Sequence, residues 1–137
     1  MATIINKRIY FKLEKILGDL EELPEYQKLK APSFMDFNVD KIYEDKERQL
    51  VRIALNHCYR QNGDVIPDPD MELFIFPDTK MVEPISYQDS LGCREVFPES
   101  GGIDFEVRKD LLVFLNQWLS NVLAQGYEKL RENAVMR

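Results

Sequence analysis

The feature that most constrains the fold is an alternation of apolar and polar residues between residues 35 and 60. Phe37 and Val39 fall on one side of an extended chain, and acidic and amide residues fall on the other. After a fully charged run at residues 44–48, the alternation resumes at Val51. A period of two is typical of a half-buried strand, and a polar break between two such runs indicates a hairpin. The sequence therefore predicts an antiparallel sheet at its centre.

The sheet is expected to continue beyond this hairpin. Strand-like runs occupy residues 71–76, 81–88 and 93–97, with a turn at residues 77–80 and a break at Gly92. Together with the first two strands they make an antiparallel meander of about five strands.

Helices are predicted at both ends of the chain. Residues 7–22 carry apolar side chains at helical spacing, and Pro24 is expected to stop that helix. Residues 27–33 show little periodicity and are interpreted as a connector. Asp104 is placed to cap a long second helix, whose wide apolar stripe covers residues 111–123. The prediction is an α+β fold with both helices packed on the sheet, in a single domain over residues 1–137.

The charge and the hydropathy of the chain limit which binding partners and which cellular location we expect. The chain has 24 acidic and 18 basic residues and a formal charge of −6, which makes nucleic acid an unlikely partner. Residues 1–6 are too short and too soon followed by charge to be a secretory signal. No apolar run reaches the roughly 20 residues that a membrane span needs. We expect a cytoplasmic protein that does not enter a membrane.

An acidic segment is the most distinctive loop in the sequence. Asn62 and Gly63 suit a turn with positive φ, and two prolines follow before Asp70. The acidic residues Asp64, Asp70 and Glu72 offer oxygen ligands for a hard cation. Their spacing does not match an EF-hand, and aspartates that form turns explain the same residues. No metal site is predicted here with confidence.

The same residues allow an enzymatic alternative. A metal-dependent hydrolase or nuclease would use Asp64, Asp70 and Glu72, with Lys80 or His57 in support. His57 is the only histidine, so a catalytic triad, a two-histidine metal site or a histidine-rich zinc site within one chain is not expected. Strand parity places His57 on the core side, which favours a hydrogen-bonded structural histidine over a catalytic base. No glycine-rich phosphate loop is present, and no cofactor is expected.

Aromatic residues suggest an interaction surface instead. Phe74 and Phe76 have the opposite parity to Leu73 and Ile75, so that strand is apolar on both sides. The second side is either covered within the chain or meets a partner. Phe74, Phe76 and Trp118 of the long helix are therefore candidate interface residues. The partner would be a second copy, forming a homodimer, or another protein.

Several separated motifs occur in order between residues 34 and 127: HCY at 57–59, NGD at 62–64, DPDME at 68–72, YQD at 87–89, EVF at 95–97 and FLNQWL at 114–119. In these motifs the chain resembles a family of short bacterial proteins, a domain of unknown function often carried by phages and integrative elements. The resemblance implies no activity and no catalytic residue.

The motifs mark His57, Asn62, Asp64, Asp70 and Glu72 as a candidate site. If the two strands pair across residues 61–69, the side chains of His57 and Glu72 are expected to meet at one edge of the sheet. The sequence nevertheless favours a non-enzymatic protein-interaction or accessory protein over the hydrolase, because it holds no nucleophile motif and no phosphate cradle.

Overall fold

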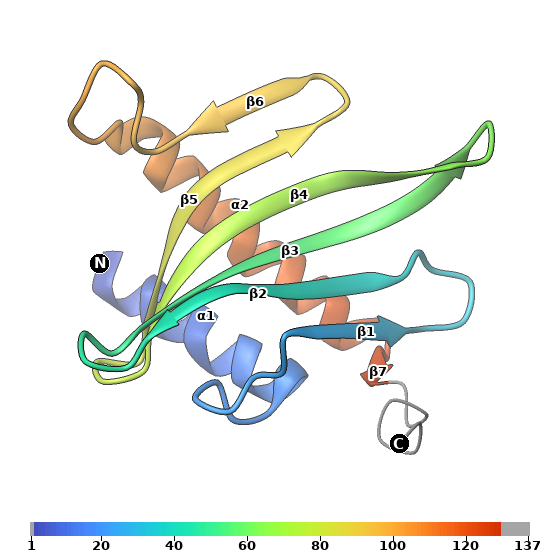
Figure 1. The fold of residues 1–137 in the computed structure, drawn as a ribbon, viewed down its shortest axis with the longest axis horizontal. Helices are drawn as coiled ribbons and strands as arrows, with labels where there is room; N and C mark the ends of the chain where they lie inside the picture. Colours follow the sequence, from blue (N-terminus) through green and yellow to red (C-terminus); the bar gives the residue numbers. More distant parts are fainter. Residues whose placement is uncertain (1, 130–137) are drawn as a thin grey trace.

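The computed structural model describes residues 2–129 (Figure 1). Two helices, α1 (Ala2–Leu17) and α2 (Phe105–Ala124), lie on one side of one sheet. The strands in chain order are β1 (Tyr26–Lys30), β2 (Phe37–Asp45), β3 (Leu50–Gln61), β4 (Asp64–Phe76), β5 (Met81–Asp89), β6 (Gly92–Glu95) and β7 (Glu128–Lys129).

The predicted α+β architecture is confirmed. The strand order is β6-β5-β4-β3-β2-β1-β7, and all paired strands are antiparallel. The meander runs through six strands, β1 to β6, where the sequence predicted about five. After α2 the chain returns to add the two-residue strand β7 beside β1. Both helices cover the same face, so the opposite face, turned toward the viewer in Figure 1, is open.

Strand β1 is the strand that the sequence analysis missed. The prediction of a connector over residues 27–33 is wrong, because Tyr26–Lys30 pairs with β2. Leu29 is buried as an inward residue should be, but its inward neighbour Gln27 is polar and equally buried. With only one apolar residue on its inner face, the strand lacks the alternation that reveals a half-buried strand.

The acidic segment is also different from the prediction. Residues 61–70 do not form a long loop, because β3 and β4 join through a tight turn at Asn62 (φ 52°) and Gly63 (φ 88°). The positive φ expected for this pair is confirmed. Pro67 lies inside β4, opposite Cys58. Strand β5 pairs with β4 only from Asp70 onward, so the proline segment is a sheet edge on its β5 side, the kind of position where strands tolerate proline.

Helix α1 ends earlier than predicted. It spans Ala2–Leu17 rather than residues 7–22, and Gly18 follows in the left-handed region with φ 86°. The Gly18 N–H donates to the Glu14 carbonyl at 2.8 Å, which closes the last turn, so Pro24 is not the terminator. Leu20 and Leu23 are buried in the core from the following loop. Their spacing imitates a continuing helix.

Helix α2 begins as predicted. Asp104 is its N-cap, and its Oδ1 accepts a hydrogen bond from the Val107 N–H at 3.1 Å. Arg108 then forms a two-pronged ion pair with Glu83 of β5, with both N···O distances 2.8 Å. Asn6 of α1 donates to the same carboxylate at 3.0 Å. Glu83 therefore links β5 to both helices. Within residues 2–129 no helix is long and apolar enough to cross a membrane.

One hydrophobic core fills the space between the helices and the covered face. Its fully buried members come from both helices and the inner rows of the strands: Ile9, Leu13, Leu29, Phe37, Ile53, Leu55, Met71, Leu73, Ile75, Leu115 and Leu119. Burial of such side chains contributes about 1.5–3 kcal/mol each before entropy is counted. Burial of these side chains determines which face of the sheet packs against the two helices.

The cap at Asp104 gives a direct test of the helix start. Replacement Asp104→Ala should lower the free energy of unfolding by about 1 kcal/mol, because the Val107 N–H loses its acceptor. Urea denaturation measures the change. The control is Asp110→Ala, which removes only a solvent-exposed ion pair with Arg94 and should cost less than about 0.5 kcal/mol. Equal losses in the two variants would contradict this account of the cap.

Candidate functional site

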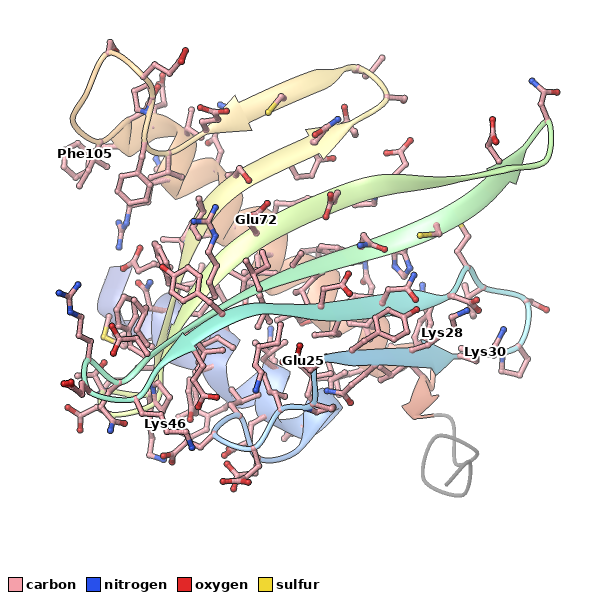
Figure 2. All side chains as sticks on the ribbon, viewed as in Figure 1. Glu25, Lys28, Lys30, Lys46, Glu72 and Phe105 are labelled. Atoms are coloured by element: carbon pink, nitrogen blue, oxygen red, sulfur yellow. The ribbon has the colours of Figure 1, made fainter. Side chains whose placement is uncertain are left out.

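The predicted convergence of His57 with Glu72 is wrong. The imidazole of His57 packs against Trp118 of α2, with ring centroids 5.4 Å apart, so it lies on the helix-covered face. Glu72 instead stands opposite Ala54 and binds Arg52, on the open face (Figure 2). Alternation along β3 and β4 separates the two side chains, because residues of odd and even position point to opposite faces.

Asn62 and Asp64 also lie apart from the other candidates. Both are exposed at the tip of the β3–β4 hairpin. Asp70 is six residues further along β4, a distance of about 20 Å at the usual rise per residue. These side chains cannot share one ligand with Asp70 and Glu72.

The carboxylates of Asp70 and Glu72 on β4 do not form a shared metal site. Glu72 Oε1 accepts from Arg52 Nε at 2.9 Å and from Arg52 Nη2 at 2.6 Å. Burial raises the pKa of Asp70, and the neighbouring charge of Glu72 raises it further. Lys80, the lysine of the hydrolase alternative, lies in the β4–β5 turn with its ammonium over the Tyr10 ring. Among the described residues no three His, Cys, Asp or Glu side chains come together as metal ligands.

The open face instead carries a continuous polar row. Lys28, Asn38, Asn56, Asp70 and Gln88 stand opposite one another across β1 to β5. Asn38 Nδ2 donates to Asn56 Oδ1 at 3.2 Å, and both amides are buried. Burying a side-chain amide without a hydrogen bond would destabilise the fold, and this bond between the two amides offsets that cost.

The candidate interface residues of β4 are also on this face. The rings of Phe74 and Phe76 lie 6.1 Å apart and are partly buried. The Arg52 guanidinium lies 5.7 Å from the Phe74 ring centroid, so part of the apolar surface is covered within the chain. Arg52 therefore covers part of the apolar surface that Phe74 and Phe76 form on the open face of β4.

Trp118, the third candidate interface residue, belongs to a pocket on the helix side of the sheet. The pocket has a volume of about 280 Å³ and opens where α2 passes the end of β3 and the β1–β2 loop. Its walls are Phe34 and Met35 of that loop, His57 of β3, Pro69 of β4, Phe114, Trp118 and Asn121 of α2, and Gln125 and Tyr127 after it. Of the nine, only His57 and Trp118 were singled out from the sequence.

The floor of the pocket is an aromatic cluster. Phe37, which is fully buried, lies 5.5 Å from Trp118 and 5.4 Å from His57 between ring centroids, both edge to face. Phe114 extends the cluster at 5.6 Å from Trp118, and Tyr127 lies 5.8 Å from His57. Such contacts contribute about 0.5–1.5 kcal/mol each beyond burial. These contacts hold the rings of the floor against one another.

The surroundings of the single histidine favour its neutral form. His57 Nδ1 lies 3.2 Å from the carbonyl oxygen of Asp36, an acceptor, so this nitrogen carries the hydrogen. Burial lowers the pKa of His57, and contacts with the Asp36 and Met35 carbonyls offset this only in part. The expected hydrogen bond of His57 is present, while its structural rather than catalytic role stays a prediction. Its Nε2 is then the acceptor nitrogen of the ring.

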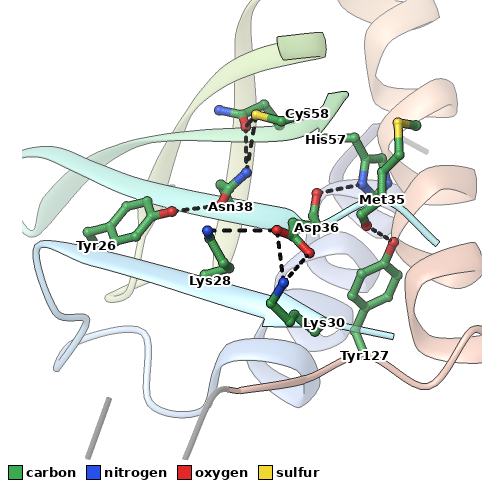
Figure 3. Close-up of polar contacts among 10 residues, drawn as sticks. Tyr26, Lys28, Lys30, Met35, Asp36, Asn38, His57, Cys58 and Tyr127 are labelled. Atoms are coloured by element: carbon green, nitrogen blue, oxygen red, sulfur yellow. Dashed lines mark hydrogen bonds and ion pairs between the residues drawn. The ribbon is translucent and has the colours of Figure 1, made fainter. Parts of the chain in front are cut away.

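Charged residues outside the pocket fix the β1–β2 loop that forms its rim (Figure 3). The Asp36 carboxylate pairs with Lys30 at 3.1 Å and with Lys28 at 3.7 Å, on the open face. The backbone carbonyl of Asp36 accepts the hydrogen bond from His57 on the helix-covered side of the sheet. Tyr127 Oη donates to the carbonyl of Met35. The loop is thus tied to β1, β3 and the segment after α2.

The indole of Trp118 is held by packing alone. Only 6% of the residue is exposed, and its Nε1 has no hydrogen-bond partner among the described residues. A buried donor without an acceptor costs about 1–3 kcal/mol, which the surrounding aromatic contacts must offset.

The lining of this pocket is uncharged and mostly apolar. None of its nine lining residues carries a charge when His57 is neutral, and none is a serine, threonine or cysteine nucleophile. The rim residues Phe34 and Met35 are 47% and 44% exposed, so apolar surface is presented to solvent at the mouth. An uncharged, flat, apolar group would fit such walls.

Comparison with known proteins places the chain in a family. The model of a domain of unknown function, DUF6908, matches residues 8–128. The chain therefore belongs to this family, whose function is unknown, in agreement with the expectation of an uncharacterised family. No curated protein and no solved structure matches it.

The protonation of His57 gives a test of the buried neutral ring. Because the pKa is lowered from 6.5 in the folded state, the unfolded chain binds more protons as the pH falls. His57 should therefore contribute stability above about pH 6.5 that is lost as the pH falls through the lowered pKa. Urea denaturation of the wild type and of His57→Phe across pH 5–8 isolates this contribution, because the other titrating groups are common to both proteins. Parallel stability curves would contradict the assignment.

Proposed function

We propose that this protein is a non-enzymatic interaction module that captures an aromatic side chain of a partner protein in the pocket over Phe37. The observation that carries the proposal is a preformed aromatic pocket without a charged wall, open to solvent and placed on the covered side of the sheet. Aromatic anchors seated in such pockets supply most of the binding energy in many protein interfaces.

The size of the pocket supports a single side chain as its occupant. Its volume of about 280 Å³ is just below the roughly 300–1,000 Å³ of pockets that enclose small molecules and cofactors. Asn121 and Gln125 stand one helical turn apart at the mouth, where their amides can bond the backbone that carries the side chain. Phe34 and Met35 supply the exposed apolar rim that interfaces favour.

The wider role belongs to the same proposal. The motif resemblance supports an accessory protein of a bacterial cytoplasm, of the kind that phages and integrative elements carry. The partner is another protein, and self-association through Phe74 and Phe76 on the open face is the competing arrangement. The acidic balance of the chain makes nucleic acid a poor partner.

Selection of binding peptides tests the proposal. A library of random peptides displayed on phage should yield binders that share an aromatic residue, because the pocket walls are aromatic. Removal of one wall by Phe114→Ala should abolish capture of those peptides. The matched control is Phe74→Ala, which removes the same ring from the opposite face and should leave capture unchanged.

Two results would count against the pocket. The first is a library that yields no binders. The second is a set of binders that depends on Phe74 and not on Phe114, which would move the interaction to the open sheet face. Sedimentation of the wild type at several concentrations, in the same series, reports any homodimer.

A further inference from the structure

Several hydrogen-bonding side chains line the pocket, and one of them, His57, can distinguish between ligands. His57 lines the pocket, and its Nδ1–H is already used by the Asp36 carbonyl. In the neutral imidazole the other nitrogen, Nε2, has a lone pair and no hydrogen. Nε2 is therefore the one acceptor that the His57 ring can offer to a ligand in the pocket.

We infer that His57 makes the pocket selective for an aromatic side chain that carries a hydrogen-bond donor, the indole N–H of tryptophan or the phenol O–H of tyrosine. The inference rests on the proposed function and names the chemistry of the partner. A ring with a donor satisfies Nε2 while its faces pack on Phe114 and Tyr127. An apolar ring of the same size covers Nε2 and removes it from water without a replacement bond.

The fixed orientation of His57 makes this selection possible. Phe37, Trp118 and Tyr127 surround the ring with centroids 5.4 to 5.8 Å away, so the imidazole has little freedom to rotate. The Asp36 carbonyl that fixes the tautomer is itself placed by the ion pairs of the Asp36 carboxylate with Lys28 and Lys30. A site whose hydrogen-bonding group is held in place rejects an analogue that lacks the matching group more strongly than a hydrophobic pocket rejects a change in size.

Two isomers test the inference with size and apolar character held constant. 3-Methylindole has the tryptophan side-chain skeleton with a free N–H, whereas 1-methylindole has the same atoms with the donor blocked. NMR titration of the full chain should show 3-methylindole binding on the order of tenfold more tightly than 1-methylindole. In His57→Phe, which keeps a ring but loses the acceptor, the ratio of the two affinities should fall to about one.

A second measurement on the wild type does not depend on how the variant folds. Because His57 is the only histidine, its Nε2 resonance can be followed in protein labelled with ¹⁵N at histidine. This resonance should move when 3-methylindole binds and stay in place with 1-methylindole. Equal affinities and an unmoved Nε2 signal would overturn the selectivity while leaving the aromatic pocket intact. Failure of both isomers to bind would overturn the selectivity and the proposed pocket together.

Discussion

The packing of Trp118 against Phe37 and His57 is the contact on which the rest of the structure depends. It joins the middle of α2 to neighbouring residues of β2 and β3, which stand opposite each other in the sheet. Truncation of a buried tryptophan or phenylalanine typically costs about 3–5 kcal/mol, so this cluster is a large fraction of the stability of a small domain. It also sets how far α2 stands from the end of β3. The pocket is the space that this separation leaves.

A sheet covered on one face only has a second consequence. Strands β1 to β5 bury inward residues under the helices, and their outward residues meet water or one another. At Phe37 and His57 the inward residues build the pocket floor, while the next residues, Asn38 and Asn56, form the buried amide pair on the open face. Asp36 connects the two sides, because its carbonyl contacts His57 and its carboxylate binds the lysines of β1.

Much of this fold could be predicted because it is encoded locally. The alternation in β2 and β3, the Asn62-Gly63 turn and the Asp104 cap each depend on a few adjacent residues, and the structure confirms them. The segment around Pro67 could not be read as strand, because its tolerance for proline depends on where β5 stops pairing. Strand β1 was missed since one of its two inward residues is a buried glutamine.

The pocket escaped prediction for a related reason. Its walls come from segments far apart in the sequence, and only the packing of α2 on the sheet brings them together. His57 and Trp118 were both singled out, but as an acidic-site residue and an interface residue on separate surfaces. The nearest signal in the sequence was that two aromatic side chains of α2, Phe114 and Trp118, are four residues apart and so share one helix face. Which part of the sheet that face meets is a tertiary property.

The central claim is that the pocket, rather than the open face, receives an aromatic group. The most direct measurement is a ¹H–¹⁵N correlation spectrum of the protein titrated with N-acetyl-tyrosinamide, because Trp118 is the only tryptophan and its indole signal is unambiguous. The account predicts that this signal moves together with the backbone signals of residues 34–36 and 121–127. Movement confined to Arg52, Glu72 and Phe74, or no movement at all, would contradict it.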